Sequence, residues 1–201
     1  MPGTSVAEVR TKSTAVLSRP RAMALPRLAG YGALAGLAGG IGMALWQMID
    51  SAATSNGFWT PLNLCMASFV WRGQAAMIEK EMMMHPGMSM NMPVAASHLA
   101  VGMLLHLAFS ALVGIVFFTV LFGLRRAGVG VLRTAPAYVA ASIAGAALLY
   151  VVMMYLVLPW ANPLMCHMTP RGPFFIGHLI YGLIFGLVAY PLARRAAPSG
   201  T

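Results

Sequence analysis

Charged residues are scarce in this chain, and acidic residues are the scarcest. Only 8% of its 201 residues are Asp, Glu, Lys or Arg, and Asp and Glu together number 4. A soluble domain averages about 25% charged residues. So few charges cannot cover a surface that faces water, and so few carboxylates argue against catalysis by paired acids. The shortage excludes an ordinary soluble domain.

Cysteine and the common catalytic motifs are also lacking. The 2 cysteines, Cys65 and Cys166, are too few for a disulfide scaffold, and they remain candidates for one disulfide, for metal ligands or for free thiols. The sequence has no phosphate-binding Gly-Lys loop, no HExxH and no nucleophile elbow. These absences favour a protein that is not an enzyme.

Apolar residues dominate instead, at 59% of the chain, with a mean hydropathy of +0.77. Four runs reach the ~20 residues that a spanning helix needs: 28–52, 95–123, 134–158 and 174–193. None alternates like a barrel strand. We therefore predict an all-α membrane protein, a four-transmembrane-helix bundle. The first run exceeds the about 7–15 residues of a signal-peptide core, which favours a permanent helix over a leader.

The basic residues indicate the orientation of these spans. Ten of the 13 fall on one side: Arg10, Lys12, Arg19, Arg21, Arg27, Arg125, Arg126, Arg133, Arg194 and Arg195. The opposite loops carry Arg72, Lys80 and Arg171. Because Lys and Arg are enriched in cytoplasmic loops, both termini are predicted in the cytoplasm and residues 55–93 outside. This placement explains the net charge of +9 without nucleic acid and suits a bacterial inner (plasma) membrane.

The two halves of the chain resemble each other. "HLAFSALVGIVFF" from His106 aligns without gaps on "HLIYGLIFGLVAY" from His178, and each copy runs on to an Arg pair. We interpret the chain as two parallel helix-loop-helix repeats. The predicted units are a disordered cytoplasmic tail (1–27), which weakly resembles a transit peptide, a first hairpin with an outer loop (28–126), a second hairpin (134–195) and a short tail (196–201).

Two further patterns concern helix packing. Small residues recur at a spacing of four, which lets helix backbones approach closely in lipid: Gly32, Gly36 and Gly40, Ser110 and Gly114, and Gly182 and Gly186. Apolar residues recur at helical spacing over 62–78, next to Trp71 and Arg72. That segment is predicted to be an interfacial helix over the outer face.

Polar and sulfur-bearing residues of all four spans are predicted at one depth. Counted from the Arg anchors at 1.5 Å per residue, they lie roughly 24 to 34 Å up, at the outer edge of a bilayer core of ~30 Å. The residues placed in this way are Gln47, Asp50, His106, Met153, Met154 and His178. The possible intramembrane polar cluster comprises Gln47, Asp50, His98, His106, Met153 and His178. Asp50 at a helix end can instead reach water, whereas an acid inside the membrane suggests function.

The segment "EMMMHPGMSMNMP" at 81–93 holds 6 Met and 1 His, and its Pro and Gly residues predict a loop. Thioether and thiolate favour Cu(I), and imidazole also suits copper. The predicted metal ligands are Met82, Met83, Met84, His85, Met88, Met90 and Met92, with Cys166, His167 and Met168 of the second outer loop. The segment resembles the Met-rich segments of bacterial copper-handling proteins. The chain as a whole is similar to small bacterial four-helix membrane proteins, a resemblance that implies a fold and no activity.

Several functions remain open on this basis. The first is Cu(I) capture at the outer face, for storage or for delivery to a cuproenzyme or transporter. The second is a structural accessory subunit of a larger respiratory or oxidase-type membrane complex, in which the Met segment is an apolar docking surface. The third is a small b-type cytochrome with haem between His106 and His178; either His can also simply bond loop carbonyls. A transporter is the weakest alternative. Expected partners are lipid and a second copy or neighbouring subunits.

Overall fold

The computed structural model describes residues 25–70, 77, 80, 84 and 95–196, apart from the side chains of 68–70. No strand occurs among these residues. Four helical segments are long and apolar enough to cross a membrane: α1 (Leu25–Ala53), α4 (Ala96–Arg126), the segment Ala135–Ala161 and α8 (Arg171–Ala196). The third segment consists of α5 (Ala135–Val152), a π-helix η2 (Met153–Val157) and α6 (Leu158–Ala161). The prediction of a multi-pass, all-helical membrane protein is confirmed.

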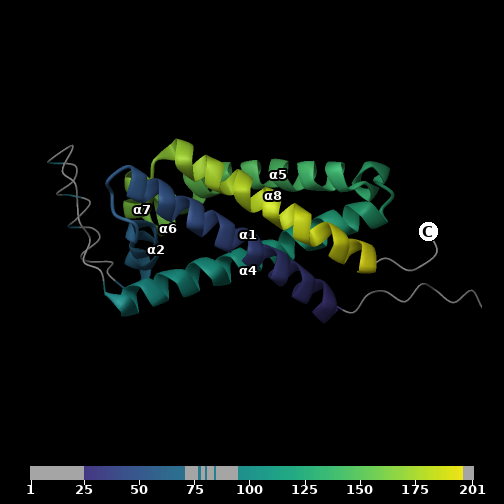
Figure 1. Cartoon of the computed structure of the whole chain (residues 1–201), viewed down its shortest axis with the longest axis horizontal. Helices are drawn as coiled ribbons and strands as arrows, with labels where there is room; N and C mark the ends of the chain where they lie inside the picture. Colours follow the sequence, from purple (N-terminus) through teal and green to yellow (C-terminus); the bar gives the residue numbers. More distant parts are fainter. Residues whose placement is uncertain (1–24, 71–76, 78–79, 81–83, 85–94, 197–201) are drawn as a thin grey trace, which may run out of the picture.

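Shorter elements lie at the two ends of this bundle (Figure 1). The helices α2 (Thr60–Val70), α6 and α7 (Pro163–Met168) gather at one end. The 3-10 helix η1 (Gly130–Arg133) joins α4 to α5 at the other end, where α1 begins and α8 finishes. The helix predicted over 62–78 is present as α2, which starts two residues earlier. Its predicted continuation over 71–76 and 78–79 lies outside the described residues.

Helices α1 and α4 touch through their backbones. A Cβ added to Gly32 would lie 2.6 Å from the Cα of Ile115, and one added to Gly36 would lie 2.8 Å from the Cα of Gly114. Only glycine permits such an approach, because any side chain would push the helices apart. The prediction that these small residues serve helix packing is confirmed, and the packing is within one chain.

Helices α5 and α8 also approach each other closely at glycine residues. A Cβ added to Gly182 would lie 2.7 Å from Ala146 Cβ, and one added to Gly186 would lie 2.9 Å from the Cα of Val139. Helix α1 also packs along α8, so the helices follow the spatial order α4, α1, α8, α5. Helices α4 and α5 hardly touch each other outside their link. The ring of helices is therefore not closed between α4 and α5.

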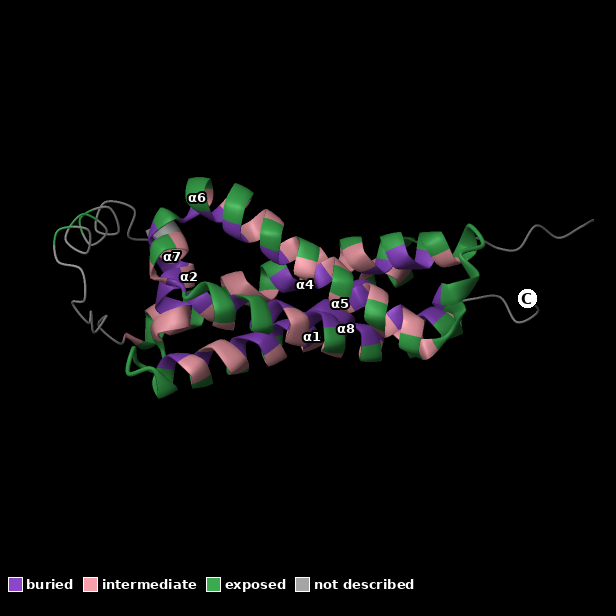
Figure 2. Cartoon of the chain, turned by 90° about the horizontal axis from the view of Figure 1, so that it is seen from above, coloured by how far each residue is buried: buried purple, intermediate pink, exposed green. Residues whose placement is uncertain are grey.

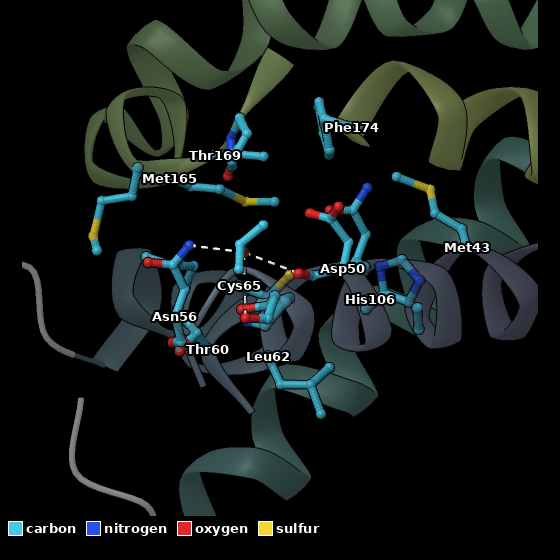
Figure 3. A pocket seen from close by; sticks show the side chains of 18 of the residues that line it. Met43, Asp50, Asn56, Thr60, Leu62, Cys65, His106, Met165, Thr169 and Phe174 are labelled. Atoms are coloured by element: carbon cyan, nitrogen blue, oxygen red, sulfur yellow. Dashed lines mark hydrogen bonds between the residues drawn. The ribbon is translucent and has the colours of Figure 1, made fainter. Parts of the chain in front are cut away.

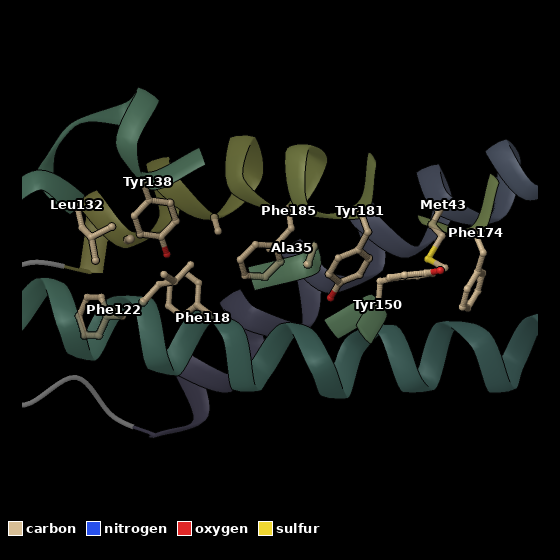
Figure 4. Close-up of a cluster of buried hydrophobic side chains, with 14 of the residues drawn as sticks. Ala35, Met43, Phe118, Phe122, Leu132, Tyr138, Tyr150, Phe174, Tyr181 and Phe185 are labelled. Atoms are coloured by element: carbon tan, nitrogen blue, oxygen red, sulfur yellow. The ribbon is translucent and has the colours of Figure 1, made fainter. Parts of the chain in front are cut away.

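Aromatic side chains fill the centre of the bundle along its length (Figure 4). Phe118 and Phe122 stack at 6.0 Å, and Tyr181 and Phe185 stack at 6.1 Å. Exposed residues recur along the outside of the long helices (Figure 2). Many of them are apolar, among them Leu104, Leu112, Leu148 and Leu187. A bundle that is apolar on both faces suits lipid, where each backbone polar group must be bonded within its own helix.

Candidate ligand site at the α2 end of the bundle

A tight turn after α1 directs α2 back across the bundle. The Ser51 hydroxyl donates to the Gly57 carbonyl at 2.8 Å, and Gly57 has φ +85°, which glycine adopts without strain. Helix α2 then lies against α4 at Gly102, where an added Cβ would collide with the Leu62 carbonyl. The turn and this glycine together hold α2 over the ends of the spanning helices.

Helix α7 completes the cap, and Asn162 holds it in place. The Asn162 side-chain oxygen accepts from the Met165 backbone N–H at 3.0 Å, as expected of a helix N-cap. Its amide nitrogen donates to the Leu64 carbonyl of α2 at 2.9 Å. Leu64, Ala67 and Leu164 form a small core of their own between α2 and α7. One buried side chain therefore fixes both the start of α7 and its contact with α2.

Two adjoining cavities lie beneath this cap. The first, the end cavity, has a volume of about 210 Å³ and is lined by α1, α2, α4, α7 and the first turn of α8. Its polar lining includes Gln47, Asp50, Ser51 and His167. The second, the side cavity, has a volume of about 420 Å³ and lies between α4 and the α5–η2–α6 segment, with Phe174, His178 and Tyr181 of α8 behind it. The side cavity is predominantly apolar.

The two cavities share a wall made of five residues. Met43 of α1, Cys65 of α2, His106 of α4, Met165 of α7 and Phe174 of α8 line both of them. These side chains converge from five helices on one region (Figure 3). Two thioethers, a thiol and an imidazole thus line the boundary between the two cavities, where the cap joins the spanning helices. We call Met43, Cys65, His106 and Met165 the soft-donor wall.

The cysteine of this wall is kept protonated by its surroundings. Burial raises the pKa of the Cys65 thiol to about 11, because a thiolate is poorly solvated there. Cys65 and Cys166 are both free thiols, so the possible disulfide between them is not formed. The Cys166 thiol instead donates to the Met154 carbonyl in the π-helix at 3.7 Å. At neutral pH the wall carries no charge from sulfur.

Both histidines of the cavities have one ring nitrogen bonded to a backbone carbonyl. His106 Nε2 lies 2.9 Å from the Gly40 oxygen, and His178 Nδ1 lies 2.9 Å from the Phe174 oxygen. A carbonyl can only accept, so each of these nitrogens carries the hydrogen and donates. The other nitrogen of each neutral ring therefore has a lone pair. The predicted bond to a loop carbonyl is wrong in detail, because both acceptors lie within helices.

The structure places the predicted intramembrane cluster as follows. Gln47 and Asp50 line the end cavity, Met153 and His178 line the side cavity, and His106 lines both. His98 lines neither. The Gln47 amide is already engaged, since it donates to the Pro173 carbonyl at 3.0 Å, beside the Trp46 ring N–H at 2.9 Å. Five of the six members thus line the cavities: two line the end cavity, two line the side cavity and His106 lies in the wall that the cavities share.

Few of the predicted metal ligands line the cavities. His167 and Met168 line the end cavity, but Cys166 lines neither cavity. Met84 has helical backbone, where a loop was predicted, and its side chain is 56% exposed. The remaining predicted ligands of the Met-rich segment lie outside the described residues: Met82, Met83, His85, Met88, Met90 and Met92.

Met43 and Met165 were missed as site residues, although each had a signal. Met43 lies four residues before Gln47 and seven before Asp50, which places all three on one helix face. Met165 precedes the predicted tripeptide Cys166-His167-Met168, and Asn162 three residues earlier is a helix N-cap signal. In α7, which starts after Asn162, Met165 lines both cavities and Cys166 packs against the core beside Met154.

Within the described part of the chain, no three His, Cys, Asp or Glu side chains are grouped closely enough to hold a metal ion. A metal held by these residues would therefore need thioether ligands as well. Comparison with protein-family models, with curated proteins and with solved structures finds no match for this chain.

Proposed function

We propose that this membrane protein binds Cu(I) at the α2 end of its bundle, for capture or delivery to a cuproenzyme or transporter. The observation that carries the proposal is the soft-donor wall, in which Met43, Cys65, Met165 and His106 line the same two cavities. Thioether, thiol and imidazole are the side chains that suit Cu(I) best. Hard cations prefer oxygen ligands, and Asp50 is the one carboxylate among the described residues of either cavity lining.

The protonation state of the wall favours thioether and imidazole as the primary ligands. Both bind as neutral groups without losing a proton, whereas Cys65 must give up a proton whose pKa is about 11. Binding through Met43, Met165 and His106 would therefore depend little on pH. If the Cys65 thiolate joins, binding releases a proton and the Cu(I) affinity increases as the pH rises.

The same proposal includes the orientation of the protein in the membrane. Both termini lie in the cytoplasm of a bacterium, the chain forms two parallel repeats, and α2 is an interfacial helix at the outer face. In this arrangement the Met-rich segment 81–93 collects Cu(I) outside and the soft-donor wall holds it. The orientation is supported by four arginines in the last turns of α4 and α8, at the end of the bundle away from α2: Arg125, Arg126, Arg194 and Arg195. Labelling of the single-cysteine variants S89C and A127C by an impermeant reagent checks it; labelling of position 127 alone would reverse it.

The test of copper binding compares two double variants of equal chemistry. Met43→Leu with Met165→Leu removes both thioethers of the wall, and such volume-conserving swaps usually cost less than about 1.5 kcal/mol. Met48→Leu with Met154→Leu is the matched control, because both residues are buried and line neither cavity. Competition with a chromogenic Cu(I) chelator in detergent should show an affinity loss of about tenfold or more in the first variant only. Equal affinities in both would refute the proposed site.

A second candidate is a small b-type cytochrome. His106 and His178 line the same side cavity, and each has one ring nitrogen bonded to a carbonyl, as axial histidines commonly do. The absorption spectrum of the purified protein separates the two candidates. A Soret band that disappears in both His106→Ala and His178→Ala would favour haem over copper.

A further inference from the structure

The side cavity has the features of a binding site for a small organic molecule, independent of any metal. Its volume of about 420 Å³ lies in the range of about 300–1,000 Å³ that is typical of such sites. Apolar and aromatic side chains make up most of its wall, among them Phe109, Leu112 and Phe174. None of the described residues that line it carries a formal charge at neutral pH. A neutral, apolar ligand fits this lining.

The cavity arises from an interruption of helix packing. The π-helix η2 follows α5 directly, and its residues Met153 and Val157 line the cavity. π-helical turns are rare and are found frequently at functional sites. Beyond η2, α6 follows at the α2 end of the bundle, and its residues Leu158 and Ala161 also line the cavity. The α4 side of the cavity is partly open, since Phe109 is 45% and Leu112 is 57% exposed. Both residues lie on a spanning helix, so the opening faces the bilayer.

The polar groups of the cavity determine what the ligand must offer. Tyr181 donates its hydroxyl to the Ser110 carbonyl at 3.0 Å, and both side-chain groups of Asn162 are used within the cap. His178 donates through Nδ1 to its own helix, which leaves Nε2 as an acceptor without a bond among the described residues. The His178 side chain is 3% exposed and borders the side cavity. A ligand in the cavity that brings a hydrogen-bond donor can therefore bond to this nitrogen.

Aromatic neighbours favour a ring beside that donor. Phe174 lies edge-on to the His178 ring at 4.6 Å, and Tyr150 lies edge-on to it at 5.6 Å. Of these rings Phe174 lines the cavity, so a ligand ring that reaches His178 from the cavity meets Phe174 and Tyr181. We propose that the side cavity binds a membrane-dissolved phenol or hydroquinone, which enters between α4 and η2 and donates its hydroxyl hydrogen to His178 Nε2.

The experiment measures saturable binding of tritiated 4-nonylphenol to the metal-free protein in nanodiscs, with empty nanodiscs subtracted. Unlabelled 4-nonylanisole, the methyl ether, has nearly the same shape and no donor. A hydrogen bond of ordinary strength predicts that the ether competes about five- to tenfold more weakly than unlabelled phenol. Equal competition would mean that the cavity accepts any acyl or alkyl chain, and the proposed hydrogen bond would be wrong.

Two variants locate the binding. His178→Phe should abolish the preference for phenol over ether. Ala108 is exposed at the α4 side of the cavity, so Ala108→Trp leaves His178 intact, places a large ring at this opening and should remove most of the saturable binding. Ala100→Trp is the matched control, since Ala100 is also an exposed alanine of α4 but lines neither cavity. Undiminished binding to Ala108→Trp would place the phenol elsewhere and overturn the proposal. Because copper is absent throughout, the result does not depend on the proposed metal site.

Discussion

Near its Arg-bearing end the bundle is held by backbone contacts and stacked rings, whereas near its α2 end the same helices separate around two cavities. Gly36 and Gly114 bring α1 and α4 together where Phe118 and Phe185 are fully buried. Farther along, His106 and Met43 occupy the corresponding faces, and space remains between α4 and α5. Residue size decides the difference, because glycine allows backbones to touch and longer side chains hold them apart. Packing strength and binding capacity are thus placed at different ends of the molecule.

The largest expected effect concerns the glycine contact between α1 and α4. Gly36→Ala inserts a Cβ against the backbone of Ser110 and Gly114. Overpacking of this kind costs about 1–3 kcal/mol and occasionally more, and backbone cannot move aside as a flexible side chain can. Thermal unfolding in detergent measures the loss. Gly30→Ala is the control, since nothing lies within 4 Å of an added Cβ there. Equal melting temperatures for the two variants would contradict the packing described.

The next prediction concerns Cys65 at the cavity end. Its pKa of about 11, against an ordinary value of 9.0, lowers the thiolate fraction at pH 8 by about a hundredfold. In a Cys166→Ser background, maleimide should react with Cys65 far more slowly in the folded protein than in sodium dodecyl sulfate. The rate of maleimide labelling of the folded protein should keep rising with pH beyond 9. The free energy of unfolding should fall as the pH rises above 9, because the thiol has the lower pKa in the unfolded chain and loses its proton there first. A folded rate equal to the unfolded one would show that folding does not raise the pKa of Cys65.

Removal of the Asn162 side chain should loosen the cap with a smaller effect. Asn162→Leu loses two hydrogen bonds and leaves the Leu64 carbonyl without its partner, at a cost of about 1–3 kcal/mol. Asn162→Ser should recover part of it, because serine still caps α7 but is too short to reach α2. Limited proteolysis near the cap and thermal unfolding both report the change. Identical behaviour of the serine and leucine variants would mean that the N-cap bond contributes nothing.

The smallest expected effect compares two tyrosines at the two ends. Tyr181→Phe removes a buried bond to the Ser110 carbonyl, and about 1 kcal/mol of stability should be lost. Tyr190→Phe removes the same kind of bond to the Arg133 carbonyl at 3.0 Å, where water can replace it. Its loss should be within about 0.5 kcal/mol, as is usual for surface substitutions. A larger loss at Tyr190 would show that water does not replace its bond to the Arg133 carbonyl.

Helix spacing in the sequence was enough to predict some residues of the candidate site. Gln47, Asp50, His106, Met153 and His178 were expected at one depth from helix rise alone, and all five line the cavities. His98, the sixth member of the predicted cluster, lines neither cavity. Helix rise gives depth and not the direction of a side chain, and it gave no signal for Met165. The Asn162 side chain caps α7 and bonds to α2, and these two bonds hold the helix on which Met165 lies.

The sequence by itself determined the helical membrane architecture, because long apolar runs must form helices in lipid, and it determined the close contacts, because only small residues allow them. Only the tertiary structure decided the order of the helices around the bundle, the gap between α4 and α5 and the π-helix that borders it. These depend on side chains far apart in the chain meeting in space. The soft-donor wall illustrates this: Met43, Cys65, His106 and Met165 come from four helices, and no spacing in the sequence brings them together.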